Sequence, residues 1–268
     1  MNTTANRKAW GVATAAGFTL MITLNALANA LPLNGVNTGQ LSDEIPNLFV
    51  PTGLTFAIWG VIYLLLLGYV VAALRDAFSN AGGALWDSED GKLFSANASL
   101  NAAWILAWHW RSIALSLLIM VGILATLIAM MERNHARGPI AASDANRVSR
   151  FLLRVPVLVY LGWICVATIA NVTAFLVTIG WNGFGIPQLW WAVLVVAVGA
   201  IVGGALVLGR GAVSSGLVVI WAYAGIVIKR SATDPSSTAP LIVAAYIGIA
   251  AVAVAIILRL YLSRKAVA

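Results

Sequence analysis

Long apolar stretches recur along this chain, and they constrain its fold more than any other feature. Each has about 16 to 26 residues, close to the roughly 20 that a helix needs to cross the hydrocarbon core of a bilayer. Of the 268 residues 61% are hydrophobic and only 9% are charged, a composition that the surface of a soluble domain does not tolerate. We therefore predict an all-α, polytopic transmembrane helical bundle of about eight helices, over residues 10–31, 52–74, 95–110, 112–131, 154–179, 189–208, 213–228 and 240–259.

The third and fourth of these stretches form one nearly continuous apolar run, residues 95–131, interrupted only around His109 to Ser112. As a single helix this run would be about 55 Å long, far more than the thickness of a bilayer. We therefore expect a tight turn around Arg111 that separates two antiparallel helices.

The distribution of basic residues among the connecting segments tests this count independently. With the N-terminus inside, 13 of the 16 Lys and Arg residues fall on the inner side, which is the asymmetry of the positive-inside rule. The three outer residues are Arg111, Lys229 and Arg230. Both termini are therefore expected in the cytoplasm of a bacterial cell, with the protein in the inner membrane. The net charge of +7 then reflects topology and anionic headgroups, and nucleic acid is not an expected partner.

The N-terminal segment also resembles a signal peptide, because Arg7 and Lys8 precede an apolar run that ends in the A-x-A pattern of residues 28–30. This run is longer than a usual signal-peptide core, and it contains Asn25 and Asn29. We therefore interpret it as the first membrane helix.

Three of the predicted helices carry aromatic residues and asparagine on one face. On the third, Asn101, Trp104 and Trp108 fall at i, i+3 and i+7, which is one stripe of a helix. A lipid-facing stripe would consist of Leu, Ile and Val, whereas buried Asn and Trp need hydrogen-bond partners. This face is therefore expected to point into the bundle, toward other helices or a cavity. Ordinary packing residues with an interfacial aromatic belt are the alternative.

Two further faces of this kind lie on the second and fifth predicted helices. Trp59 and Tyr63 are i, i+4 neighbours, and Tyr160, Trp163, Ala167 and Asn171 run at i, i+3, i+7 and i+11. We expect the three faces to converge on one mostly apolar cavity in the outer half of the first five helices. The candidate ligand-binding residues are Phe56, Trp59, Tyr63, Asn101, Trp104, Trp108, Tyr160, Trp163, Ala167 and Asn171.

Three sequence motifs of this chain, which occur in the same order as in the family, resemble the tryptophan-rich sensory protein / translocator protein family (TspO/MBR). They are P-x-G-x-x-F…W-x-x-x-Y from Pro51 to Tyr63, L-N-x-x-W from Leu100 to Trp104, and Y-L-x-W-x-x-x-A-x-x-x-N from Tyr160 to Asn171. The resemblance covers about residues 10–180, the five helices usual in that family, which leaves residues 181–268 as three additional membrane helices. It implies a receptor, sensor or carrier that binds porphyrin, haem-related or sterol-like ligands. Phe56 and Trp59 stand one residue closer than in the family pattern, which implies a pocket of different shape.

A secondary transporter or permease for a small apolar or amphipathic solute is the alternative function. Ion-coupled transporters commonly place ionisable side chains near the bilayer midplane, whereas all nine acidic residues of this chain lie in loops or at predicted helix ends. An enzyme is not expected, because the sequence contains no nucleophile–base pair, paired carboxylate or phosphate-binding glycine loop.

The remaining polar and small residues predict packing and topology. His109 is expected at the membrane interface and His135 in a solvated loop, and with the lone Cys165 they predict no metal site or cofactor. The inner loop 75–94 is expected to be an ordinary solvated connection, and the charges of the inner loop 132–153 are expected to set topology, with a short interfacial helix as an option. Glycine and serine from Gly199 to Gly216 predict close helix packing.

The expected partners are the lipid bilayer and a ring-rich apolar molecule such as a porphyrin or sterol. A homodimer is a further possibility that the sequence leaves open. An interfacial aromatic belt is predicted at Trp181, Trp190 and Trp191.

The charge asymmetry generates a direct test of topology. A reporter fused after residue 145 should be cytoplasmic, and one fused after residue 185 should be external, because the predicted fifth helix crosses the membrane between them. A phosphatase that is active only outside the cytoplasm is fused at each position, and its enzymatic activity is measured. The opposite pattern at either position would contradict the count of eight.

Overall fold

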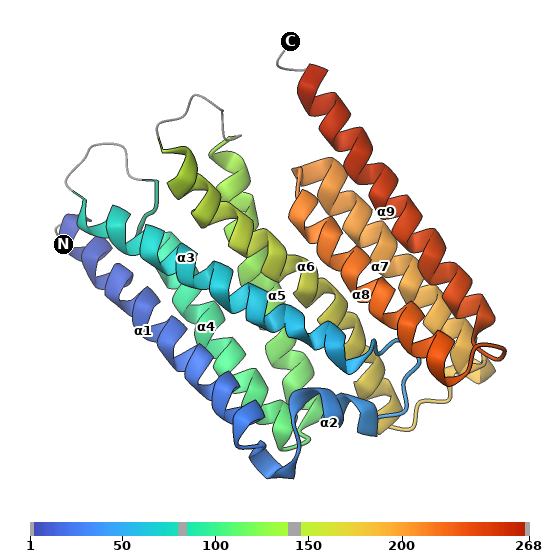
Figure 1. The fold of residues 1–268 in the computed structure, drawn as a ribbon. Helices are drawn as coiled ribbons and strands as arrows, with labels where there is room; N and C mark the ends of the chain where they lie inside the picture. Colours follow the sequence, from blue (N-terminus) through green and yellow to red (C-terminus); the bar gives the residue numbers. More distant parts are fainter. Residues whose placement is uncertain (1–2, 80–84, 139–145, 266–268) are drawn as a thin grey trace. The chain divides into compact units, whose positions relative to one another are not determined.

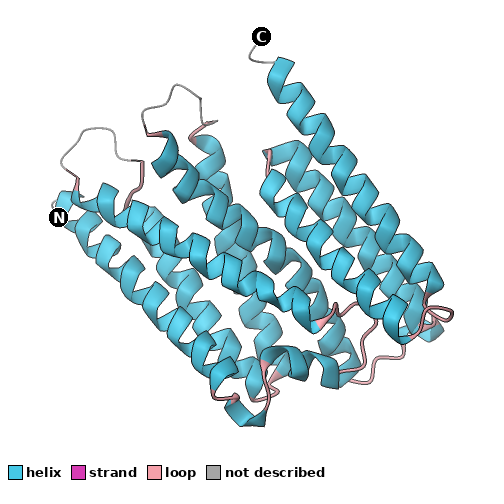
Figure 2. Ribbon diagram, viewed as in Figure 1, coloured by secondary structure: helices cyan, strands magenta, loops and turns pink. Residues whose placement is uncertain are grey.

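The computed structural model describes residues 3–79, 85–138 and 146–265, and every regular element in these ranges is helical (Figures 1 and 2). The elements are α1 (Thr3–Ala30), η1 (Leu33–Gly35), α2 (Thr38–Glu44), η2 (Gly53–Ala57), α3 (Ile58–Phe78), α4 (Ser88–His109), α5 (Ile113–Ala136), α6 (Arg147–Thr178), η3 (Gly183–Gly185), α7 (Gln188–Arg210), α8 (Val213–Thr233) and α9 (Ala239–Lys265).

The predicted fold class, a polytopic membrane helical bundle, is confirmed. Seven stretches within the described residues are long and apolar enough to cross a membrane. The helix outside this set is α4, which begins with charged residues and carries Asn97 and Asn101 in its middle. Both asparagines are buried, so α4 is the most polar of the long helices and directs that polarity into the protein.

The expected turn between the third and fourth long helical segments is also confirmed. Helix α4 ends at His109 and α5 begins at Ile113. Between them Arg111 adopts a left-handed backbone with φ 55°, and the Ser112 N–H donates to the Ala107 carbonyl at 2.9 Å. Several helices extend further than their apolar residues predicted; α4 begins at residue 88 instead of 95, because charged residues form its first turn.

The chain divides into two compact units. Unit 1 comprises Met1–Thr38 and Trp59–Tyr160, and unit 2 comprises Gly39–Ile58 and Leu161–Ala268. The boundary of the two units therefore falls inside α6. The expected division into a five-helix part at 10–180 and a three-helix part at 181–268 stays a prediction.

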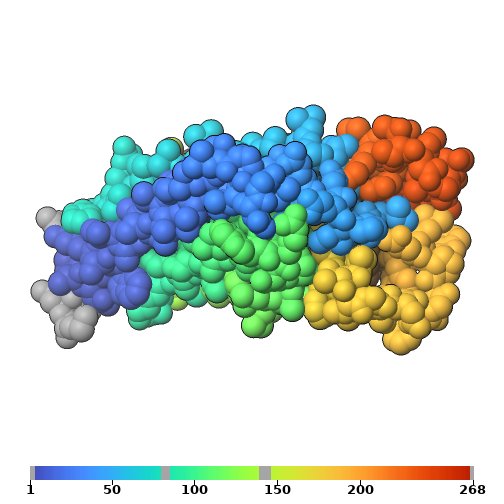
Figure 3. All heavy atoms as spheres, turned by 90° about the horizontal axis from the view of Figure 1, so that it is seen from below, coloured from blue at the N-terminus to red at the C-terminus, as the bar shows by residue number. Residues whose placement is uncertain are grey.

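In unit 1, α4 packs between α1 and α5. Gly17 of α1 lies against α4, where a Cβ atom would meet Ala98 at 3.4 Å. On its other side α4 is joined to α5 by Asn97, whose amide donates to the Ile123 carbonyl at 3.2 Å and to the Thr126 hydroxyl at 2.9 Å. Figure 3 shows the end of α1 (blue) beside the α4–α5 turn (green), where the Asn34 amide donates to the His109 carbonyl at 3.0 Å.

In unit 2, α7, α8 and α9 pack against one another through small residues. Gly199 and Gly248 lie against the ring of Tyr223, whose hydroxyl donates to the Val196 carbonyl at 2.5 Å. Gly162 of α6 lies against the backbone of Ser215 in α8. The predicted close packing is thus confirmed at these positions. Gly204 is an exception, since a Cβ atom there would meet nothing within 4 Å.

The contact at Gly162 gives a prediction about stability. In Gly162→Ala the new Cβ would lie 2.7 Å from both Cα and O of Ser215, which are backbone atoms that cannot move aside. Such overpacking costs about 1–3 kcal/mol, so the variant should unfold at a lower temperature in detergent. The matched control is Gly204→Ala, which gains helix propensity of up to about 1 kcal/mol without a clash. Equal unfolding temperatures for the two variants would contradict the close approach of α6 and α8.

Candidate functional site

An aromatic cluster in unit 1 contains six of the ten predicted ligand-binding residues. Its centre is Trp59, at the start of α3, whose ring stacks on Tyr63 with centroids 5.5 Å apart. The Trp59 ring also lies 6.3 Å from that of Trp104 and 5.7 Å from that of Tyr160. Trp104 in turn stacks on Trp108 at 5.8 Å. Side chains of α3, α4 and α6 therefore form one continuous aromatic surface, which we call the Trp59 cluster.

A buried chain of hydrogen bonds holds the polar side of the Trp59 cluster. The Asn25 amide of α1 donates to Asn101 Oδ1 at 2.8 Å, and the Asn101 amide donates to the Tyr160 hydroxyl at 2.5 Å. Asn101 and Tyr160 are fully buried, and Asn25 is nearly so. Three helices are thereby joined by polar groups that would each cost free energy if they were left without a partner in an apolar medium. The predicted inward orientation of the Asn101 stripe is confirmed, while its role in ligand binding stays a prediction.

One polar atom of this cluster has no partner. Trp104 is only 5% exposed, and its indole Nε1–H has no acceptor among the residues that the structure describes. The neighbouring Trp108 differs, because its Nε1–H donates to the Thr38 carbonyl at 3.4 Å. Buried indole N–H groups usually have a partner, so the donor of Trp104 is unusual among the described residues of this cluster.

The other four predicted residues lie in unit 2. Phe56 in η2 packs edge to face on Trp163 of α6, with centroids 5.7 Å apart and ring planes at 82°. Asn171 is buried and donates to the carbonyl of Ala167 at 3.3 Å, within its own helix. The ten residues therefore form two groups, and their convergence on one cavity stays a prediction.

Unit 2 also contains a pocket that the sequence did not predict. It has a volume of about 430 Å³ and lies between the C-terminal end of α6 and the start of α7. Its walls include Trp181 and Trp191, whose rings lie 4.9 Å apart. At its polar edge the Asn47 amide donates to the Thr173 hydroxyl at 2.5 Å. The two tryptophans were expected only as interfacial anchors, because their spacing across a turn shows no helical face.

The segment between α1 and α3 is folded against α8, one of the last three helices. Lys229 pairs with Asp43, and Arg230 donates to the carbonyls of Asn47 and Val50 at 3.2 and 3.3 Å. The indole N–H of Trp221 donates to the Thr55 carbonyl at 3.0 Å. A sequence that is rich in Asn, Gly and Pro is thus held as part of unit 2 by side chains about 180 residues further along.

The two histidines have different environments. His109 lies at the end of the α4–α5 hairpin as expected, but its side chain is fully buried in the protein, and its Nδ1 lies 2.8 Å from the Ile105 carbonyl; its position at the membrane interface stays a prediction. The i, i+4 bond within α4 lets the ring turn inward at the helix end. His135 is exposed as expected, but it lies in the last turn of α5. The described residues contain no group of three or more His, Cys, Asp and Glu that could hold a metal ion.

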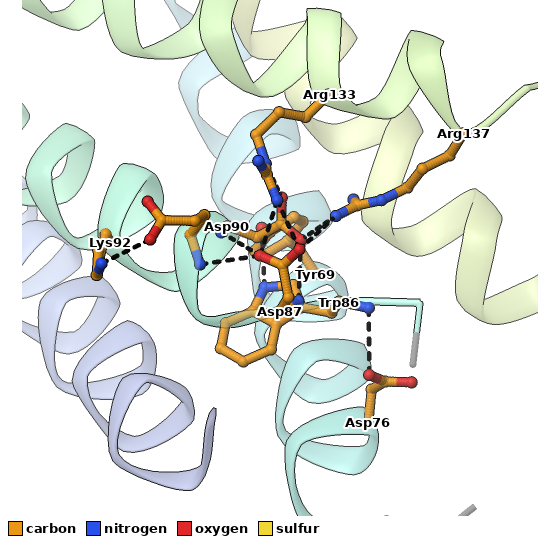
Figure 4. Close-up of polar contacts among 9 residues, drawn as sticks. Tyr69, Asp76, Trp86, Asp87, Asp90, Lys92, Arg133 and Arg137 are labelled. Carbon is orange, nitrogen blue, oxygen red and sulfur yellow. Dashed lines mark hydrogen bonds and ion pairs between the residues drawn. The ribbon is translucent and has the colours of Figure 1, made fainter. Parts of the chain in front are cut away.

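The expectation of a solvated connection at residues 75–94 is wrong for Asp90, which is buried, whereas Arg75, Glu89 and Lys92 are exposed as expected; residues 80–84 and 139–145 lie outside the described part of the chain. Asp87 caps α4 by accepting from the N–H groups of Glu89 and Asp90, and Asp90 accepts from the Asp87 N–H at 3.0 Å. Arg133 and Arg137 of the neighbouring helical hairpin pair with both carboxylates, at 2.8 and 2.5 Å from Asp90 (Figure 4). Because Asp90 is buried, these pairs compensate a charge that would otherwise be costly.

The electrostatics of this ion-pair cluster follow from its geometry. Partial burial raises the pKa of Asp87, but the Asp90 N–H and the Arg133 and Arg137 guanidinium groups outweigh it and hold that pKa below its ordinary value. Directly beneath, the buried Trp86 indole donates to the Tyr69 hydroxyl at 3.2 Å. Helix periodicity could not predict the pairs of Arg133 with Asp87 and Asp90, since these residues lie more than 40 positions apart in the sequence.

Comparison with known proteins identifies the family. The family model described as "TSPO-like protein" matches residues 11–258. The match continues through α7, α8 and most of α9, beyond residue 180, where the resemblance was expected to end. No curated protein and no solved structure matches the chain significantly. Because the family model covers nearly the whole chain, this multi-pass membrane protein belongs to the TSPO-like protein family.

Proposed function

We propose that this protein is a membrane receptor, sensor or carrier, and that it binds a flat, largely apolar, ring-rich molecule against the Trp59 cluster. Porphyrins, haem-related compounds and sterol-like molecules have this shape and polarity. The observation that carries the proposal is the buried indole N–H of Trp104, which has no acceptor among the described residues and lies beside the ring of Trp59.

The chemistry of the cluster favours this ligand class. Large aromatic faces bind planar rings by stacking, worth about 0.5–1.5 kcal/mol per pair beyond the burial of area. The Trp104 N–H can donate to one acceptor on the ligand, which would fix its orientation. Carboxylates of a ligand such as a porphyrin would have to reach the membrane surface, because burying each without a cation costs several kcal/mol.

The positions of the acidic residues make an ion-coupled permease the weaker alternative. All acidic residues except Asp144, which lies outside the described ranges, are found in short elements or near the ends of long helices. Asp87 and Asp90 form ion pairs with Arg133 and Arg137. A proton or ion relay through the membrane would need such groups near its midplane.

Removing only the indole N–H tests the proposal. Trp104→Phe keeps an aromatic ring but loses the donor, so the affinity for protoporphyrin IX should fall about threefold to tenfold, the effect of one neutral hydrogen bond. Trp59→Ala should cause a larger loss, because it removes the central stacking surface. Binding is measured by titrating the purified protein in nanodiscs and following porphyrin absorbance.

The matched control is Trp190→Phe, the same substitution at a residue of α7 that is 53% exposed. Trp221 is unsuitable as a control, since its N–H holds the Thr55 carbonyl. An unchanged affinity in both Trp104→Phe and Trp59→Ala, with a loss in Trp191→Phe, would place the ligand in the α6–α7 pocket and contradict the proposal. No binding of a porphyrin or sterol by the intact protein would contradict the ligand class.

A further inference from the structure

Unit 1 contains a hollow away from the Trp59 cluster, beside the ion-pair cluster of Figure 4. Its volume is about 340 Å³. Of the seven described residues that line it, three are arginines and none is acidic. The lining residues are Leu85, Asn134, Arg137, Gly138, Arg150, Leu153 and Arg154.

Arg137 faces both the ion-pair cluster and this hollow. Its contacts with Asp87 and Asp90, at 3.4 and 2.5 Å, are all made by one nitrogen, Nη2. A guanidinium has five N–H donors in a rigid plane, so the contacts through Nη2 hold the orientation of Arg137, which also lines the hollow. The buried Asp90 thereby positions the guanidinium of Arg137 as one cationic wall of the hollow.

Arg150 and Arg154 form the opposite wall from α6. They are i, i+4 neighbours, so they project from one face of that helix. Nη2 of Arg150 donates to the Arg137 carbonyl at 2.8 Å, and Nη1 of Arg154 lies 3.4 Å from the Gly138 carbonyl. These bonds to the end of α5 fix both side chains at the rim and direct two further guanidinium groups toward the same space.

We propose that this hollow binds a phosphate-bearing anion through Arg137, Arg150 and Arg154, with the Asn134 amide as an additional donor. Arginine binds phosphate oxygens through paired N–H donors, which gives both charge and geometry. Leu85 and Leu153 add an apolar surface that suits the glycerol and upper acyl carbons of a lipid. The positive-inside asymmetry puts the site at the cytoplasmic surface, where anionic headgroups and free phosphate are both present. The site is independent of the ligand proposed for the Trp59 cluster.

Native mass spectrometry of the full chain in detergent tests this site. The probes are dioleoylphosphatidylglycerol, dioleoylphosphatidylcholine and inorganic phosphate, each titrated separately. We expect the anionic lipid to bind more tightly than the zwitterionic one, and the double variant Arg150→Gln/Arg154→Gln to weaken it by about tenfold or more. The control is Arg264→Gln/Lys265→Gln, which removes the same charge from the exposed end of α9 and should leave the affinity unchanged.

The outcomes separate the two sources of phosphate. If inorganic phosphate binds and displaces the anionic lipid, the site accepts free phosphate; if it does not compete, the site is specific for a lipid headgroup. Equal losses in the two double variants, or equal affinity for both lipids, would overturn the proposal. If the double variant does not give a monodisperse protein, Arg154→Gln alone decides, because its contact with the backbone is the weaker one. An unchanged affinity in that variant would also overturn the proposal.

Discussion

The structure depends on one constraint: a polar group in a membrane helix must find its partner inside the protein, because the hydrocarbon offers none. Helix α4 shows this most clearly. Its Asn97 bonds to α5 and its Asn101 to α1 and α6, so each asparagine joins helices that apolar packing alone would hold less specifically. Several buried polar atoms have no partner in the described part of the chain, and the indole N–H of Trp104 is the one that lies in the Trp59 cluster, which is why the proposed ligand rests on it.

Charged groups follow the same constraint at the helix ends. Asp90 is buried and is tolerated because two arginines and an N-terminal capping box satisfy it. In unit 2, Arg230 of α8 uses backbone carbonyls of the segment between α1 and α3 instead of a carboxylate. Helix α8 is therefore an integral part of how that segment folds, which agrees with a family match that runs through it.

The sequence predicted the helices because their apolar runs have the length of a bilayer, and it predicted the inward face of Asn101 from its spacing with Trp104 and Trp108. It could not predict partners that are distant in the chain, such as Arg133 for Asp90, since periodicity assigns a face but names no neighbour. The burial of His109 could not be predicted for a related reason: a polar residue at a helix end suggests an exposed side chain, whereas its bond to Ile105 allows full burial. The pocket beside Trp181 is built by a turn and two helices, a combination with no periodic signature.

A structure of the protein with bound protoporphyrin IX tests the central claim most directly. The claim predicts a ligand acceptor about 3 Å from Nε1 of Trp104, with the porphyrin plane in contact with the ring of Trp59. It further predicts that the hydrogen bonds from Asn25 through Asn101 to Tyr160 are unchanged. These residues would support the aromatic surface and would not themselves bond to the ligand. A porphyrin seated between Trp181 and Trp191, with the Trp104 N–H still lacking an acceptor, would contradict it.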